Sequence, residues 1–315
     1  MADRPHDDAV EAVVVEEVVV EEDQAPLGRR LAAEFVGTLL LVAVGAGAAT
    51  VLAVGPAERL TEMIDRITAQ GGTPADAQLF APLLANQLGD LLPVAFAFAT
   101  VLAVLVYAFG GVSGAHFNPA VTFALAVSRR FNWAEVPLYW VAQCIGGIVG
   151  AFVVAGIYGD RGAAVGETDI FFGATVVSEN IDQFPAILSE AFIGFILMTA
   201  IMAIAVDRRA PKGWSGLVIG LALGGGILVT GAATGGSANF ARSLGPFVAS
   251  LVYETGQIPW EDLIVYAVGP LIGAAAAAMI YESVTGLERV APPPEPGAAT
   301  HDEDVVPPPP PMTTP

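Results

Sequence analysis

The sequence has few of the residues from which catalytic and metal sites are built. Its 315 residues include three histidines and a single cysteine, Cys144. One cysteine excludes an internal disulfide and a cysteine-based metal cluster. Two of the histidines, His6 and His301, lie in the end segments, which also excludes a paired-histidine or Ser-His-Asp arrangement. We therefore expect no enzyme activity, no bound metal and no cofactor.

Charged residues are also scarce, at 14% of the chain, and they are unevenly placed. The formal net charge of −19 comes mostly from the two ends, since residues 1–27 alone contain nine acids and one arginine. Basic clusters of the kind that bind nucleic acid are missing, so we expect no nucleic-acid partner. Residues 1–27 mix valine blocks with acids and residues 286–315 are rich in proline, which predicts two disordered tails.

Long apolar runs make up most of the remainder, with 54% hydrophobic residues and a mean hydropathy of +0.64. A bilayer core of about 30 Å needs about 20 mostly apolar residues in a helix. Six such runs are too uniformly apolar to be buried in one small soluble domain. They predict an all-α membrane protein with transmembrane helices at residues 31–54, 91–109, 137–158, 186–206, 214–230 and 263–281.

Lysine and arginine collect in the loops on one side of the predicted membrane. Such loops normally face the cytoplasm. We therefore predict that both termini are cytoplasmic and that the protein resides in the plasma membrane. The basic residues on the predicted cytoplasmic side are Arg29, Arg30, Arg129, Arg130, Arg208, Arg209, Lys212 and Arg289, against Arg59, Arg66 and Arg161 outside.

The first extracellular loop, residues 55–90, is unusually long. Within it Leu60, Met63, Ile64 and Ile67 are spaced as on one face of an amphipathic helix. We expect this helix to lie over the outer mouth of the protein or at the bilayer interface.

The chain contains two copies of a short sequence motif, and each copy is called a phrase below. Residues 113–122 read SGAHFNPAVT and residues 235–243 read GGSANFARS, and each phrase lies between the second and third spans of one half. Glu34 and Glu190 stand at matching places in the first span of each half. Because each half has three spans, the halves must run in opposite directions through the membrane. Inverted repeats of this kind place a substrate path near the midplane.

Each phrase is followed by an apolar stretch too short to cross a membrane. Asn118 and Asn239 are favoured helix N-caps, and Pro119 suits the first helical position, which Phe240 occupies in the second copy. We predict two re-entrant half-helices whose N-termini meet near the bilayer centre. The asparagine amide groups would then be free to donate hydrogen bonds into a pore.

These features together resemble the aquaporin, or major intrinsic protein, family over residues 28–285. The resemblance rests on the stretches AEFVGT, SGAHFNPAVT, GGSANFARSLGP and VGPLIGA. It implies a channel domain of six tilted helices and two half-helices, assembled as a homotetramer with one pore per subunit. It also implies that the family's paired pore motif is Asn118, Pro119, Ala120, Asn239, Phe240 and Ala241.

The resemblance further implies a narrow filter formed by Phe98, Ile227, Gly236 and Arg242. His116 would line the pore on its cytoplasmic side, while Glu34 and Glu190 would support the re-entrant loops.

Water-conducting members of the family typically carry a histidine where this chain has Ile227, and glycerol-conducting members carry an aspartate where it has Ser243. The pattern favours water as the solute that crosses the bilayer, with glycerol or other small uncharged solutes as the alternative. Two further alternatives are a secondary transporter and a non-conducting membrane scaffold. The first lacks titratable residues beyond the two glutamates and Arg242, and the second would require a plugged filter.

Overall fold

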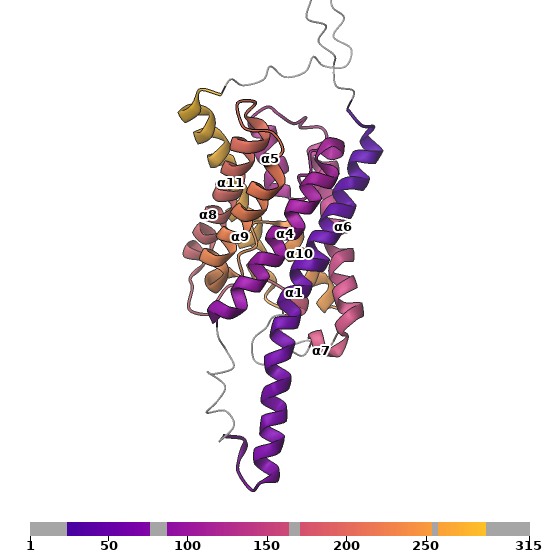
Figure 1. Ribbon diagram of the computed structural model, residues 1–315, viewed down its shortest axis with the longest axis vertical. Helices are drawn as coiled ribbons and strands as arrows, with labels where there is room; N and C mark the ends of the chain where they lie inside the picture. The colour runs from indigo at the N-terminus through magenta and orange to yellow at the C-terminus, as the bar shows by residue number, and fades with distance from the viewer. Residues whose placement is uncertain (1–23, 76–86, 164–170, 254–257, 288–315) are drawn as a thin grey trace, which may run out of the picture.

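The computed structural model describes residues 24–75, 87–163, 171–253 and 258–287, and all the regular structure within them is helical (Figure 1). Six long helices enclose two short ones. The long helices are α1 (Leu27–Ala69), α4 (Gln87–Ser113), α6 (Val136–Tyr158), α8 (Gln183–Ile201, extended by η2, Met202–Val206), α9 (Ser215–Thr234) and α11 (Leu263–Thr285). The short helices at the centre are α5 (Pro119–Val127) and α10 (Phe240–Ser250), and single turns form α7 (Asp160–Ala163), η1 (Phe171–Gly173) and η3 (Trp260–Asp262).

Each long helix contains a stretch apolar and long enough to cross a membrane. The outward faces of these helices carry large apolar side chains, among them Phe96, Ile157 and Val229, each about two-thirds exposed. A surface of this kind is unfavourable in water. The predicted all-α fold with six transmembrane helices is therefore confirmed, and the chain is an integral membrane protein.

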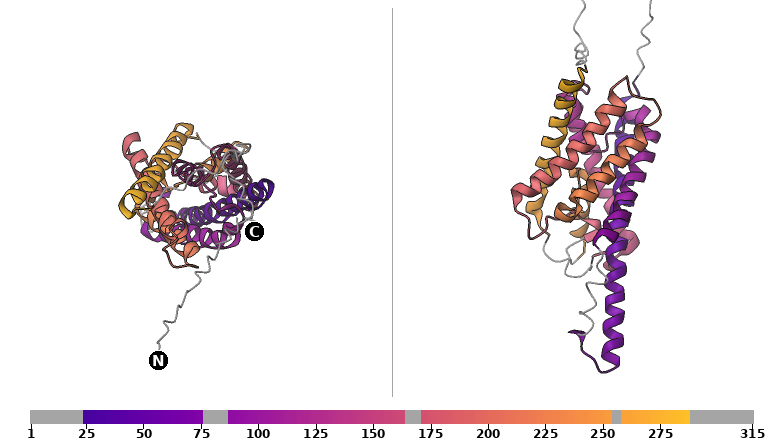
Figure 2. Two further views of the ribbon diagram at one scale, coloured as in Figure 1. Left: turned by 90° about the horizontal axis from the view of Figure 1, so that it is seen from above. Right: turned by 60° about the vertical axis from the view of Figure 1, so that its left-hand side comes forward.

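The long helices form a ring when the bundle is viewed along its axis (Figure 2). We call the end at which α1 begins and α11 ends the terminal end (Figure 1). Neighbouring helices approach closely where glycines replace larger residues. A side chain at Gly150 would collide with the Leu39 carbonyl of α1, and one at Gly273 with the Ala191 carbonyl of α8. The same close pairing thus recurs in both halves, as an inverted repeat requires.

The first helix differs from its prediction. Instead of ending near Val54, α1 continues without a break through Gly55 and Pro56 to Ala69, where it projects beyond the bundle (Figure 1). One proline removes a single backbone hydrogen bond, and the helix-favouring residues that follow keep the helix going. Residues 60–67 are therefore helical as expected, but they continue α1, and the expectation that this helix lies over the outer mouth is wrong. The rest of the predicted loop includes residues 76–86, which lie outside the described residues.

The two half-helices lie at different levels, α5 nearer the terminal end and α10 nearer the opposite end (Figure 1). Their first residues, Pro119 and Phe240, follow directly on Asn118 and Asn239, as predicted. Residues 1–23 and 288–315, which hold most of the two predicted tails, lie outside the described residues.

Candidate functional site: a central cavity at the meeting point of two half-helices

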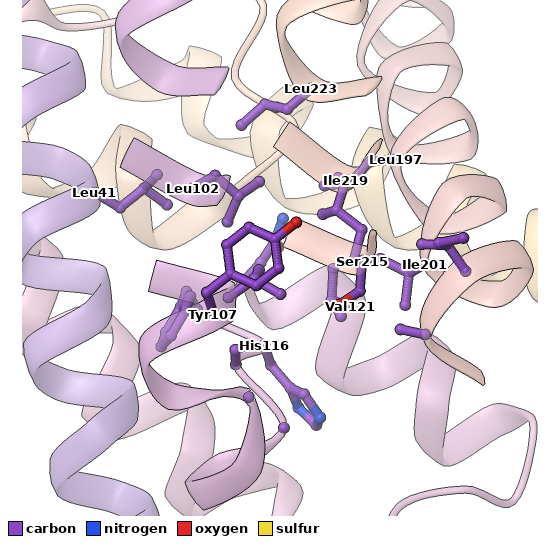
Figure 3. A pocket seen from close by; sticks show the side chains of 18 of the residues that line it. Leu41, Leu102, Tyr107, His116, Val121, Leu197, Ile201, Ser215, Ile219 and Leu223 are labelled. Atoms are coloured by element: carbon purple, nitrogen blue, oxygen red, sulfur yellow. The ribbon is translucent and has the colours of Figure 1, made fainter. Parts of the chain in front are cut away.

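A cavity of about 490 Å³ runs from the terminal end of the bundle to its centre. It begins at the loop before α9, where Lys212 and Gly213 line it, and it ends at Phe98 and Arg242. Most of its wall is apolar. Figure 3 shows this part of the lining, with Leu41 and Leu102 on one side and Leu197, Ile201 and Ile219 on the other.

Asn118 and Asn239 begin the two half-helices and both line the cavity. Each has extended backbone angles and caps its helix with the side-chain oxygen. The oxygen of Asn118 accepts the Ala120 N–H at 2.9 Å. The oxygen of Asn239 accepts the N–H of Ala241 at 3.0 Å and that of Arg242 at 3.3 Å. Two helix N-termini, each with roughly half a positive charge, therefore face the same point.

The two asparagine amide groups also bridge the loops to one another. Asn118 Nδ2 donates to the carbonyl of Ala238, and Asn239 Nδ2 donates to the carbonyl of Phe117, both at 2.8 Å. Both amide groups were expected to be free, and this expectation is wrong in one respect. One N–H of each group holds the opposite loop, which leaves the second N–H as the donor available at the cavity.

The loops that lead into the half-helices have matching backbone conformations. Gly114 and Gly235 both have a positive φ, at 86° and 76°. The residues just before the caps, Phe117 and Ala238, repeat the pattern with φ values of 49° and 56°, which is unfavourable for residues with a side chain. Such a conformation persists only where neighbouring groups hold it.

Two buried carboxylates hold these loops. Glu34 accepts the backbone N–H groups of His116 at 3.0 Å and Phe117 at 2.6 Å. Glu190 does the same for Ser237 at 2.9 Å and Ala238 at 2.8 Å. Each glutamate therefore satisfies the last two N–H groups before its asparagine cap. Further donors to the two carboxylates are Ser113 and Gln143 for Glu34, and Thr234 for Glu190.

Arg242 closes the inner end of the cavity. Its side chain is only 3% exposed, its Nη1 donates to the Gly173 carbonyl at 2.8 Å, and its guanidinium carbon lies 4.9 Å from the centre of the Phe98 ring. The Phe98 ring in turn lies against Gly45 of α1. Among the described residues no carboxylate forms a direct ion pair with Arg242, although the buried Glu190 lies close enough to interact with its charge, and Arg242 lines the cavity.

The other two residues of the expected filter lie beside one another. A side chain at Gly236 would begin 3.1 Å from the Cα atom of Ile227. Both residues are buried, and neither is among the residues that line the described cavity. The structure therefore brings Phe98 and Arg242 together at the cavity and places the Ile227–Gly236 pair outside its lining.

His116 also lines the cavity (Figure 3). Its Nδ1 lies 3.1 Å from the hydroxyl of Thr122, and its ring packs against those of Phe131 and Tyr139. The two aromatic contacts and the hydroxyl fix the ring orientation.

Two features of the site were not expected from the sequence. Tyr107 lines the cavity beside the loop before α9 (Figure 3), where its hydroxyl donates to the Gly213 carbonyl at 3.0 Å and accepts the Leu217 N–H. In the second half-helix, the hydroxyl of Ser243 forms hydrogen bonds with the hydroxyls of Thr175 and Ser237, at 2.7 and 2.6 Å. Neither feature has a sequence signal, because each joins segments far apart in the chain.

Comparison with known proteins agrees with this geometry. The sequence model of the major intrinsic proteins matches residues 21–281. The chain belongs to this family. Major intrinsic proteins are membrane channels and not enzymes, so this chain is a passive channel.

Individual relatives support the same conclusion. The chain is 38% identical to aquaporin AqpM of Methanothermobacter marburgensis over 259 residues, which are 82% of this chain and 98% of the relative. It is 41% identical to the probable aquaporin AqpM of Archaeoglobus fulgidus over 257 residues, 81% of this chain and 96% of that protein. The fold is similar to the X-ray structure of the aquaglyceroporin from Plasmodium falciparum, with a TM-score of 0.63 and 22% identity over 82% of this chain and 97% of that one.

Proposed function

We propose that the protein conducts water through the central cavity and excludes protons and ions. The observation that carries this proposal is the meeting of two capped half-helices at the cavity, with Asn118 and Asn239 each bridging to the opposite loop. A water molecule that reaches this point meets two N–H donors fixed in space. Along the apolar wall it has few partners, so it moves on readily.

Proton exclusion follows from the charges around the same point. Both half-helices direct their positive N-terminal ends at the cavity centre, and the buried Arg242 adds a full positive charge at its inner end. A cation or a hydrated proton is repelled there, as it is at half-helix ends in water channels. A neutral water molecule is oriented with its oxygen toward the asparagines.

We propose that Phe98, Ile227, Gly236 and Arg242 form the selectivity filter at the inner end of the cavity. Phe98 and Arg242 would contact the solute directly, and the small Gly236 beside Ile227 would set the width. Conduction of glycerol or other small uncharged solutes is a second candidate. It is favoured by the absence of a histidine at position 227, and the solved structure with a similar fold is that of an aquaglyceroporin.

The assembly and its placement are part of the same proposal. We propose a homotetramer in the plasma membrane with one pore per subunit and with both termini in the cytoplasm. The distribution of arginine and lysine between the loops at the two ends of the bundle supports this orientation.

The test is osmotic shrinkage of vesicles that contain the purified protein, followed by stopped-flow light scattering. We expect faster shrinkage than in empty vesicles, with a low activation energy, and no increase in proton entry when a membrane potential is applied. Arg242→Val should keep water flux and admit protons or small cations. Shrinkage no faster than that of empty vesicles would rule out the water channel, while shrinkage with glycerol entry at a similar rate would favour the second candidate.

A further inference from the structure

A second, smaller cavity lies on the other side of the half-helix starts. It has a volume of about 170 Å³. Its walls come from α6 and α11, and its floor comes from the first residues of α5 and α10. The lining residues are Pro119, Ala120, Trp140, Cys144, Phe240, Tyr266, Ala267 and Leu271.

The polar groups of this lining are already satisfied. Trp140 Nε1 donates to the Pro119 carbonyl at 3.0 Å, and the Tyr266 hydroxyl donates to the Thr234 carbonyl at 2.8 Å. A water molecule in a cavity needs two or more polar partners, and these groups do not offer them. The cavity therefore favours an apolar occupant. An apolar cavity of about 150 Å³ stays dry and binds a molecule of the size of benzene.

The surface around this cavity is apolar, which indicates that the cavity faces the lipid of the bilayer. Trp140, Cys144, Ala267 and Leu271 are all partly exposed, so the cavity reaches the outer surface of the bundle. Next to them on the same two helices, the outward side chains are large and apolar: Val141 and Ile145 on α6, and Ile264 and Ile272 on α11, are each about half exposed.

The depth of the cavity identifies which part of a lipid can reach it. Pro119 and Phe240 are the first residues of half-helices that start from opposite halves of the bundle, so both lie near its middle. In a bilayer this level contains only the ends of the acyl chains, because the headgroups lie about 15 Å away or more.

We propose that the terminal segment of a lipid acyl chain binds in this cavity, between α6 and α11. Phe240, which stands where the first half-helix has Pro119, provides an aromatic wall that a proline would not. The occupant would touch the same residues that begin the half-helices, so it would support the asparagine caps from the side facing the lipid. This inference concerns lipid binding and does not depend on which solute crosses the channel.

The experiment uses Trp140 as the reporter. The other three tryptophans, Trp133, Trp214 and Trp260, are replaced by phenylalanine, and the full-length protein is reconstituted into phosphatidylcholine vesicles free of detergent. The lipids carry bromine, which quenches tryptophan fluorescence on contact, either near the chain end or near the carboxyl group. We expect chain-end bromine to quench Trp140 strongly and carboxyl-end bromine to quench it weakly.

Two substitutions separate binding in the cavity from mere contact with lipid. Ala267→Phe fills the cavity from α11 and should abolish the preference for chain-end bromine. Ile264→Phe places the same side chain on the outer face of α11, one turn away, and should preserve the preference. Cys144→Phe fills the cavity from α6, so it tests the inference independently if the first variant does not fold.

Three results would overturn the inference. Equal quenching by the two lipids would show that no chain end reaches Trp140. An unchanged preference in both filled variants would show that lipid only passes over the surface. No quenching by either lipid would show that something else, such as a second copy of the chain, covers this face.

Discussion

Ile227 is the residue at which the choice between water and glycerol can be tested. It is buried beside Gly236, where a larger polar side chain would narrow the space and add a hydrogen-bonding group. We expect Ile227→His to reduce any glycerol flux while sparing water flux, because a carbon chain needs more width than a water molecule. Paired measurements of water and glycerol permeability in the same vesicles test this.

The matched control is Val229→His on the outward face of the same helix, where the side chain is 66% exposed. This variant should leave both permeabilities unchanged. An equal loss of water and glycerol flux in Ile227→His would contradict the placement of Ile227 in the filter.

At the level of single residues, local interactions could be predicted from the sequence and long-range hydrogen bonds could not. The two asparagine caps were predictable, because an N-cap depends on its own side chain and the next two or three residues. The bridge from Asn118 to Ala238 joins residues 120 positions apart, and no local pattern encodes it. The Gly173 carbonyl that accepts from Arg242 was not predicted either. Every residue has a backbone carbonyl, so the type of residue does not indicate which carbonyl accepts.

The re-entrant loops are elements that depend on carboxylates from other helices. Replacing Glu190 by alanine removes the acceptor for the N–H groups of Ser237 and Ala238. We expect a loss of about 2 to 6 kcal/mol in stability, since each orphaned buried donor costs about 1 to 3 kcal/mol. Glu190→Gln should lose less, because its amide oxygen still accepts.

Thermal unfolding in detergent measures this loss as a lower midpoint. The control is Glu62→Ala on the projecting part of α1, where the side chain is exposed. A Glu190→Ala midpoint equal to that of the control would show that the loop holds its shape without the carboxylate.

The short helix η1 positions the acceptor of Arg242. Gly173 at its end has a φ of 71°, and a side chain there would collide with the Ala46 carbonyl of α1. We expect Gly173→Ala to displace η1, to release the Arg242 guanidinium and to lower both the unfolding midpoint and the water permeability.

Gly156→Ala is the control for this change. Gly156 lies in α6 with open space at its Cβ position, so alanine should be neutral or stabilise the helix by up to about 1 kcal/mol. Normal water flux in Gly173→Ala would show that Arg242 does not need this acceptor.

The helices themselves were largely predictable. The thickness of the bilayer requires about 20 mostly apolar residues in each spanning helix, and such runs are easily recognised in a sequence. The exception is α1. Where it leaves the membrane, the hydrocarbon no longer constrains the chain, and the propensity of residues 57–69 continues the helix.

At the scale of the whole molecule, contacts at the terminal end tie the segment between α8 and α9 to α11. Arg209 donates to both carboxylate oxygens of Asp207 and to the Thr285 carbonyl, and the Tyr281 hydroxyl donates to Asp207 at 3.0 Å. The hydrogen bonds from Arg209 lower the pKa of Asp207 well below its usual range. Arg130, in the loop after α5, and Glu282 of α11 form a further ion pair.

Because the pKa of Asp207 is lowered on folding, its contribution to stability is complete above about pH 4, the usual range of an aspartate. It declines as the pH falls from there toward the lowered value. We therefore expect Asp207→Asn to lower the unfolding midpoint at neutral pH and to differ less from the wild type as the solution becomes acidic. Unfolding curves recorded across this pH range, with Asp65→Asn on the exposed part of α1 as control, test it. A difference that stays constant into acid would show that the charge of Asp207 contributes nothing.

The bridge between the two asparagine loops also sets an order of events during synthesis. The partner of Asn118 lies 120 residues further along the chain. At about 5 to 20 residues per second, the ribosome needs roughly 6 to 24 seconds to supply it. Through that interval the first loop has an unmatched amide and an unmatched carbonyl at the depth of the hydrocarbon, where such groups are costly. We therefore expect the first loop to stay out of contact with the hydrocarbon until the second half arrives.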